Sequence, residues 1–233
     1  MDQFFPETAK NLVRVLEYFG FECSYNTEQT CCGLPAYDAG YVDMAKELGL
    51  KMLGELDNRK ASVCPSGACT TMMRLYYPDL FYNTASHIIS KNLQKNLSEF
   101  TELMLPLWQK KEPKASFSGK VVFFNSCLAK NYCNIENQPI EILKSITNLS
   151  LVSFPNNNEC CGFCGIFSIK NEPESVAMGK SVLELALSTG ADYLVTDDAS
   201  CLLQLQSIAQ KQTYNIKIKH LIDVIAESLK LTP

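Results

Sequence analysis

The tripeptide Cys-Cys-Gly occurs twice in this chain, at residues 31–33 and 160–162. Adjacent cysteines rarely form a disulfide with each other, because their Cα atoms lie about 3.8 Å apart, below the usual disulfide range. On a loop, however, both thiols can point at one soft metal centre. The chain holds 11 cysteines and does not begin with an export-signal pattern. These features favour metal or redox chemistry over a disulfide framework.

Charge and hydropathy exclude several classes of function. The formal net charge is −4, and no basic stripe is present that could neutralise nucleic-acid phosphates. No apolar run approaches the roughly 20 residues that span a bilayer. No GxGxxG fingerprint, Walker loop or Ser-His-Asp arrangement can be singled out. We therefore expect a cytoplasmic protein with no transmembrane segment and no nucleic-acid partner, whose reduced thiols are available to Zn²⁺ or to iron–sulfur clusters.

The same order of helices and strands surrounds each Cys-Cys-Gly. In the first unit the patterns predict helices over residues 7–19 and 41–56 and strands over 21–25 and 61–63. In the second they predict strands over 120–125, 151–154 and 193–195 and helices over 140–146 and 173–188. Such alternation is typical of parallel sheets with crossover helices. The expected fold is α/β, with two pseudo-symmetric Rossmann-like units.

The repeat also suggests a division of the chain. We expect a first cysteine-rich unit over residues 1–82, a helical connection over 83–118 that ends in a linker at 113–119, and a second unit over 119–233. Cys127 stands 33 positions before Cys160, whereas the same distance before Cys31 falls ahead of Met1. The first unit therefore lacks its opening strand and its opening cysteine, and we expect a natural or artefactual shortening of the start.

Several other residues have expected roles of a structural kind. Residues 86–89, Ser-His-Ile-Ile, resemble residues 219–222, Lys-His-Leu-Ile, and we interpret both histidines as residues that begin helices. Asp197 and Asp198 are interpreted as helix caps. The segment around Trp108 is expected in the core, and the glycines of the two motifs are expected to adopt a positive φ. The cysteines follow strands, so they should meet at the edge where the carboxyl ends of parallel strands lie.

These patterns resemble the lactate utilization protein A family and, more broadly, the cysteine-rich (CCG) iron–sulfur subunits of glycolate oxidase and of heterodisulfide reductase. The resemblance covers essentially the whole chain. Its duplicated motif is specific. The matching segments are residues 29–37, 65–72, 125–127, 159–163, 167–170 and 189–192.

The resemblance implies that each unit presents an opening cysteine, the Cys-Cys pair and a later cysteine to an iron–sulfur cluster, for which we expect the [4Fe–4S] type. The first site would retain Cys31, Cys32 and Cys69, and the second Cys127, Cys160, Cys161 and Cys201. Cys64 and Cys164 are further candidates, and Cys164 stands where glycine is usual. Residues 128–130 replace a usual histidine and arginine. Cys23 and Cys133 are expected to be structural.

The resulting hypothesis is an iron–sulfur electron-transfer subunit of a cytoplasmic system that oxidises L-lactate or a related 2-hydroxy acid such as glycolate. By resemblance, the partners would be a ferredoxin-like iron–sulfur subunit and a third lactate-utilization protein, and the chain would not turn over substrate alone. Two alternatives remain open. One is a structural zinc-binding module, and the other is a thiol–disulfide redox subunit like heterodisulfide reductase.

Overall fold

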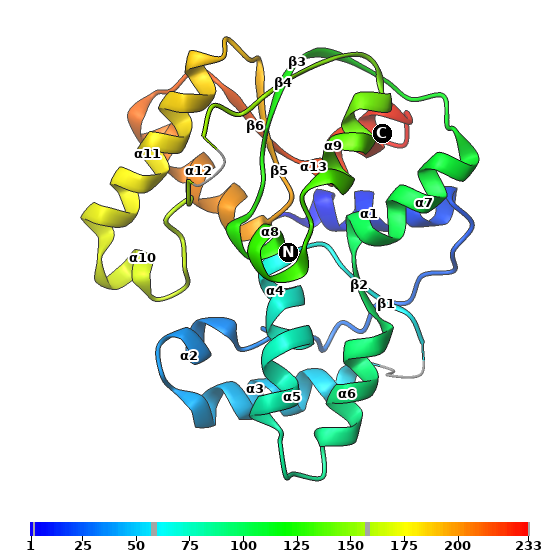
Figure 1. Ribbon diagram of the computed structural model, residues 1–233, viewed down its shortest axis with the longest axis vertical. Helices are drawn as coiled ribbons and strands as arrows, with labels where there is room; N and C mark the ends of the chain where they lie inside the picture. Colours follow the sequence, from blue (N-terminus) through cyan, green and yellow to red (C-terminus); the bar gives the residue numbers. More distant parts are fainter. Residues whose placement is uncertain (2, 57–59, 157–158, 233) are drawn as a thin grey trace.

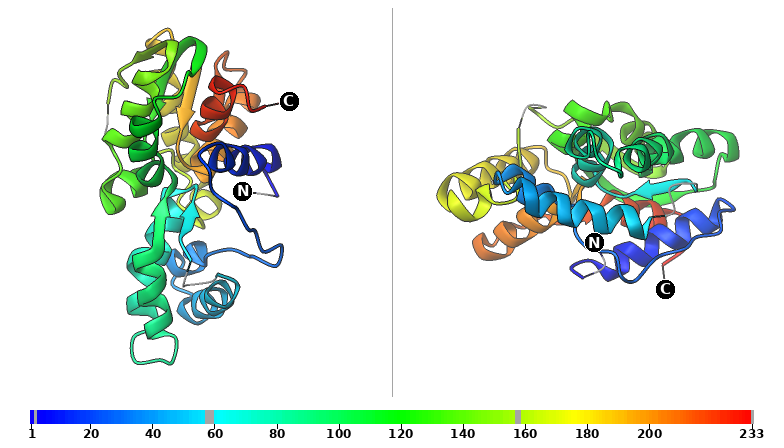
Figure 2. Two further views of the ribbon diagram at one scale, coloured as in Figure 1. Left: turned by 90° about the vertical axis from the view of Figure 1, so that its right-hand side faces the viewer. Right: turned by 90° about the horizontal axis from the view of Figure 1, so that it is seen from below.

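The computed structural model describes residues 1, 3–56, 60–156 and 159–232, and it has two lobes (Figure 1). The larger lobe is built around a four-stranded parallel sheet, and the smaller lobe is mainly helical. Helices α4 (Gly67–Thr71) and α8 (Cys127–Cys133) lie where the lobes meet. Both chain ends lie on the larger lobe, near each other in the side view of Figure 2. The expected α/β class with parallel sheets is confirmed.

The first half of the chain supplies most of the helical lobe. Segment η1 (Met72–Tyr76) is a π-helix that joins α4 to α5 without a break; such segments are rare and are frequent at functional sites. Strands β1 (Ser62–Cys64) and β2 (Leu97–Glu99) form a two-stranded parallel sheet. The other helices are α1 Pro6–Tyr18, α2 Leu34–Asp38, α3 Val42–Glu55, α5 Tyr77–Leu80, α6 His87–Asn96 and α7 Phe100–Lys111.

The second half forms the four-stranded sheet in the order β4-β3-β5-β6, with all neighbours parallel. The strands are β3 Ser116–Phe124, β4 Thr147–Val152, β5 Tyr193–Thr196 and β6 Lys217–His220. The helices, besides α8, are α9 Asn137–Ser145, α10 Phe167–Lys170, α11 Glu172–Ser188, α12 Ala199–Gln212 and α13 Leu221–Ser228.

Alternate side chains of β3 enter two different cores, because successive residues of a strand point to opposite faces of the sheet. Val121 and Phe123 pack in a core that also holds residues of α1, α7, α9 and α13. Val122 and Phe124 pack in a second core with residues of α11 and α12. A third core lies in the helical lobe and includes Cys32. The sheet is thus covered on both faces, as parallel sheets require.

The described parts of the two units share part of their topology. The run β1-α4-β2-α7 corresponds to β5-α12-β6-α13. The units also exchange helices, since α1 contacts α13 and α7 contacts α9. Figures 1 and 2 show α1 beside α13 in each view. Packing therefore crosses residues 82 and 118, and the division of the chain at those residues remains a proposal.

The expected strand over residues 21–25 is wrong, because this segment is irregular in the structure. Its counterpart, β4, pairs only with β3, and the described part of the first unit contains no strand equivalent to β3. A strand without a partner leaves its backbone groups unpaired, so this segment, most of whose residues are exposed, forms no strand.

The linker expected over residues 113–119 is also shorter than predicted. Ser116 already pairs with Thr147, and Gly119 pairs with Leu149 after a shift in register. Gly119 has a φ of 149°, a conformation that glycine adopts readily. The strand therefore continues through a bulge, whose polar and glycine residues resemble those of a loop.

The similarity between residues 86–89 and 219–222 does not reflect equivalent positions. His220 ends β6 and caps α13, where the backbone N–H of Ile222 donates to its Nδ1 at 3.2 Å. The residue that ends β2 and caps α7 is Glu99. His87 instead begins α6 and stacks edge-on against Tyr82. Both histidines do lie at helix starts, as expected, but the topological partner of His220 is Glu99.

Close packing of α4 on α8 generates a first prediction. A Cβ atom on Gly67 would lie 2.4 Å from the Cβ and 2.7 Å from the Cα of Ala129. Gly67→Ala should therefore lower the free energy of unfolding by about 2 kcal/mol, measured by urea denaturation. Gly54→Ala is the control, because nothing lies within 4 Å of its added methyl; it should be neutral or stabilising by up to about 1 kcal/mol. Equal effects of the two substitutions would contradict this packing.

Candidate metal centres

The second Cys-Cys-Gly loop brings five thiols together. The Sγ of Cys160 lies 3.9 Å from that of Cys127 and 4.0 Å from that of Cys164. The Sγ of Cys161 lies 2.7 Å from that of Cys201. Cys161 and Cys201 are buried, whereas Cys164 is exposed. The pocket therefore runs from the core of the larger lobe to the surface, and it contains every cysteine expected at this site.

The first Cys-Cys-Gly loop builds a smaller version of the same pocket. The Sγ of Cys32 lies 3.4 Å from that of Cys69, the counterpart of the contact between Cys161 and Cys201. Cys64 ends β1, and its buried thiol neighbours Cys69. Cys31 is the exposed member. The three expected cysteines thus meet here, and Cys64 joins them as a fourth thiol.

Glycine and helix N-termini position the thiols in the same way at both sites. Gly33 and Gly162 have φ values of 89° and 80°, and each backbone N–H donates to the Sγ of the first cysteine of its pair at 3.4 Å. A Cβ on Gly162 would lie 2.4 Å from the carbonyl oxygen of Ser175. Cys69 and Cys201 occupy the first turns of α4 and α12. Helix N-termini favour negative charge, so both features favour thiolates.

Thiols in each pocket compete for protons. Hydrogen bonds from the thiols of Cys127, Cys161 and Cys164 lower the pKa of Cys160, whereas the pKa of each of those three is raised, because each donates to the Cys160 thiolate or is buried near it. In the first pocket the hydrogen bond with Cys32 lowers the pKa of Cys31 to about 6. Like charges cannot gather in a buried pocket without compensation. Only a bound cation or cationic cluster would let all the thiols ionise together.

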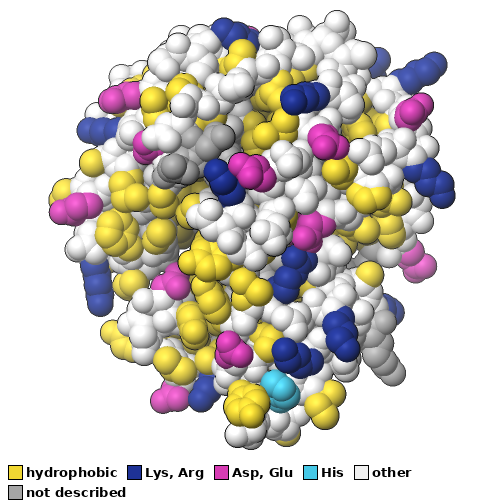
Figure 3. Space-filling model, viewed as in Figure 1, with side chains coloured by type: hydrophobic (Ala, Val, Ile, Leu, Met, Phe, Trp, Pro, Cys, Tyr) yellow, Lys and Arg dark blue, Asp and Glu magenta, His cyan; other side chains and the backbone are white. Residues whose placement is uncertain are grey.

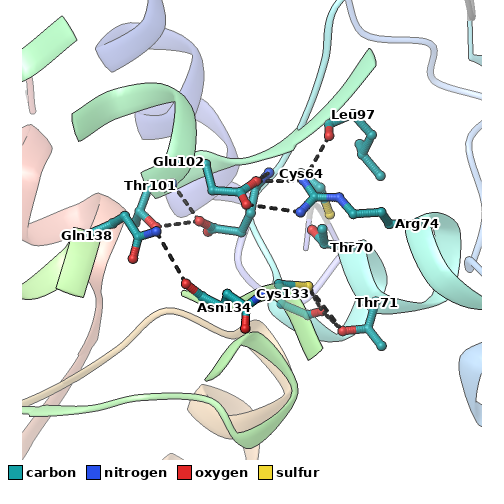
Figure 4. Close-up of polar contacts among 12 residues, drawn as sticks. Cys64, Thr70, Thr71, Arg74, Leu97, Thr101, Glu102, Cys133, Asn134 and Gln138 are labelled. Atoms are coloured by element: carbon teal, nitrogen blue, oxygen red, sulfur yellow. Dashed lines mark hydrogen bonds and ion pairs between the residues drawn. The ribbon is translucent and has the colours of Figure 1, made fainter. Parts of the chain in front are cut away.

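The remaining cysteines do not join these pockets. Cys133 is buried between α4 and α8, with its Sγ 3.4 Å from the hydroxyl of Thr71 (Figure 4). Cys23 packs at the edge of the core that holds α1 and α13, and burial raises its pKa. The expectation that these two are packing residues agrees with their positions.

An ion pair and a capping box join the helical segment that follows Cys69 to the start of α7. Neither was predicted from the sequence. Arg74 of η1 forms two hydrogen bonds with Glu102, at 3.0 and 2.6 Å, and donates to the carbonyl of Leu97 at 2.9 Å (Figure 4). Glu102 in turn accepts from the backbone N–H of Glu99 at 2.9 Å. This network ties the π-helix to the junction of β2 and α7.

Buried acidic groups lie between the two pockets. Glu99, Asp197 and Asp198 are each no more than 2% exposed. Burial, and then the nearby carboxylate of Asp197, raises the pKa of Glu99 to about 8. Burial also raises the pKa of Asp197 to about 7. Asp198 is the cap of α12, as expected. Glu99 and Glu102 form a capping box at the start of α7, but the usual signature has Ser, Thr, Asp or Asn at the first position, so only Glu102 matched it.

Apolar and aromatic side chains surround the exposed ends of the pockets. Tyr37 of α2 stacks on Tyr76 of η1, with ring centroids 4.8 Å apart, and Tyr132 of α8 is 48% exposed. Figure 3 shows hydrophobic side chains gathered on this face between the regions of α8 and α2.

Helices in the described ranges are all too short or too polar to cross a membrane. Within those ranges, no group of three or more His, Cys, Asp or Glu side chains is arranged to hold a single metal ion.

Comparison with known proteins gives consistent matches. The cysteine-rich domain family, CCG, matches residues 1–74 and 121–206. Lactate utilization protein A 1 of Bacillus mycoides (strain KBAB4) is 32% identical, over 98% of this chain and 94% of its own length. Lactate utilization protein A of Geobacillus sp. (strain WCH70) is 32% identical, over 97% and 94%. Among solved structures, an aspartate racemase homologue from Pyrococcus horikoshii OT3 aligns with a TM-score of 0.32 at 11% identity, over 97% of this chain and 93% of that one. A similarity this low supports no argument.

The raised pKa of Glu99 generates a second prediction. The folded chain keeps the Glu99 proton up to about pH 8, whereas the unfolded chain releases it near the ordinary value of 4.5. Stability that depends on Glu99 is therefore present at low pH and is lost as the pH rises from 4.5 through 8. Between these pH values, Glu99→Gln should reduce the loss of unfolding free energy by up to about 1 kcal/mol per pH unit. The measurement is urea denaturation of the reduced, metal-free protein. Asp43→Asn, at an exposed position, should leave the slope unchanged; equal slopes in all three proteins would contradict the burial effect.

Proposed function

Since the chain belongs to the lactate utilization protein A family of cysteine-rich proteins, we propose that it is an iron–sulfur electron-transfer subunit of a lactate-oxidising system. The two matched thiol pockets carry this proposal. Each combines a Cys-Cys pair with a cysteine on a helix N-terminus and at least one further thiol. Cysteine thiolates grouped in this way are the usual ligands of iron–sulfur clusters.

The donor sets fit such clusters. In the second pocket, Cys127, Cys160, Cys161 and Cys201 would be the ligands, with Cys164 within reach of the same centre. In the first, Cys31, Cys32 and Cys69 would be joined by Cys64, which has Thr196 as its counterpart at the end of β5 in the second unit. We propose that Cys64 is the fourth ligand of the first site. When bound, the clusters would accept and release single electrons.

The chain's own residues would contribute position and shielding. The backbone N–H groups of Gly33 and Gly162 would donate to ligand sulfurs, and such hydrogen bonds raise the reduction potential of iron–sulfur clusters. Buried thiols on the core side keep water away, whereas Cys31 and Cys164 reach the surface. Electrons would therefore enter and leave on the side of the two Cys-Cys-Gly loops.

The same proposal covers the partners and the compartment. A ferredoxin-like iron–sulfur protein and a third lactate-utilization protein would exchange electrons with this chain in the cytoplasm, and turnover of lactate or a related 2-hydroxy acid would require that assembly. The contact of 2.7 Å between the sulfurs of Cys161 and Cys201 favours a second candidate, direct thiol–disulfide redox chemistry. A colourless protein that cycles between two thiols and a disulfide would support the second candidate.

A third prediction tests the ligand sets. Protein purified without oxygen should be brown and should contain iron and sulfide. Cys161→Ser should remove the iron of the second site and Cys32→Ser that of the first, so that each loses about half of the total. Cys133→Ser is the matched control, because it is a buried cysteine outside both pockets. Cys64→Ser should weaken the first site alone. Equal iron in all four variants would refute the assignment, and an iron-free, colourless wild-type protein would refute the proposed function.

A further inference from the structure

The N-termini of α4 and α12 meet head to head between the two pockets. These helices are counterparts in the repeat, and each begins at a capping residue three positions before a pocket cysteine: Ser66 before Cys69, and Asp198 before Cys201. The Ser66 hydroxyl donates to Oδ2 of Asp198 at 2.7 Å. The two caps, 132 residues apart in sequence, are therefore bonded to each other.

One carboxylate caps both helices. Oδ1 of Asp198 accepts from the backbone N–H of Ser200 at 2.9 Å and from the hydroxyl of Ser200. Oδ2 accepts from the backbone N–H of Ala68 at 2.9 Å and from the hydroxyl of Ser66. These four donors fill the acceptor sites of an ionised carboxylate. Asp198 is 0% exposed, so water and salt screen its charge weakly.

The same carboxylate lies next to one thiol of each site. Ala68 immediately precedes Cys69, and Ser200 immediately precedes Cys201. The backbone N–H of Cys69 also donates to the hydroxyl of Ser66 at 3.4 Å, and the same hydroxyl donates a hydrogen bond to Asp198. A single buried negative charge is thus held beside the first turn of each helix that carries a pocket cysteine.

Resting on the iron–sulfur function proposed above, we propose that Asp198 is a positioning residue shared by both sites, and that its charge lowers the reduction potentials of both clusters together. Each reduction brings one electron from an external donor to a cluster and makes that site more negative by one charge. A buried anion close by opposes this addition. Because the anion is common to both sites, it would act on the two potentials in the same direction.

Neighbouring acidic groups are not bonded to the caps of both helices. His220 does lie near Pro65 and Asp197 of the two units, but burial lowers its pKa and so favours the neutral ring. Asp197 accepts from the backbone N–H of Ser126 at 2.9 Å, next to Cys127, and so it belongs to the second site. Glu99 accepts from Thr101 at the start of α7, and His220 caps α13. Asp197→Asn is therefore a control: it replaces a neighbouring buried carboxyl group that is bonded beside only one of the two sites.

The experiment is a redox titration of the complete, iron-loaded chain, followed by visible and electron paramagnetic resonance spectra. Asp198→Asn should raise both midpoint potentials, whereas Asp197→Asn should move the second more than the first. Iron per chain is measured in every sample. A wild-type chain without iron overturns the proposed function. A wild-type chain with both clusters, whose potentials Asp198→Asn leaves unchanged or moves at one site only, overturns the role of Asp198.

A charge exchange covers the case in which Asp198→Asn fails to fold or to bind iron. Ser66→Asp combined with Asp198→Ser moves the carboxylate to the equivalent cap on the other helix. If the charge is shared by symmetry, this double variant should fold, bind iron at both sites and return both potentials close to those of the wild type, whereas Asp198→Ser alone should not. Failure of the exchange to restore iron binding and the potentials would overturn the proposal.

Discussion

The contact between the N-termini of α4 and α12 brings the two units together. Its geometry depends on Asp198, whose two oxygens cap one helix each. Helix N-termini carry partial positive charge and repel one another, so two of them can meet only around an anion. Since Cys69 and Cys201 stand on these first turns, the same contact determines where the buried thiols of both pockets lie. The two sites therefore share one structural contact, the one between α4 and α12.

Exchange of helices makes the larger core common to both units. Helix α1 precedes the first Cys-Cys-Gly and α7 lies in the connection between the units, yet they pack against α13 and α9 of the second unit. The first unit has only a two-stranded sheet, and its helical lobe has a core of its own. Helix α4 of that unit packs on α8 of the second unit. The two thiol pockets therefore lie at a junction that residues of both units hold in place.

Residue patterns predicted the repeat, the parallel topology and the grouping of cysteines, because adjacent thiols with a positive-φ glycine leave few other structures. They failed where the answer depends on a partner in space. Residues 21–25 have strand composition but no neighbouring strand to pair with. Residues 86–89 resemble residues 219–222 in sequence, yet the residue equivalent to His220 is Glu99. Their positions at the end of a strand and the start of a helix show this equivalence, whereas their side chains differ in type. Cys64 could be assigned to a pocket only once β1 was seen to end beside Cys69. The link between Ser66 and Asp198, far apart in the chain, has no local signature at all.

The contact between α1 and α13 also governs the order in which the chain can fold. Helix α1 spans Pro6–Tyr18 and is synthesised long before its partner α13, which spans Leu221–Ser228. Until α13 is made, α1 can pack only on part of its native surface, which includes Trp108 of α7 stacked on Phe19. Contacts between residues so distant in sequence form slowly. Closure of the larger core must therefore follow synthesis of α13.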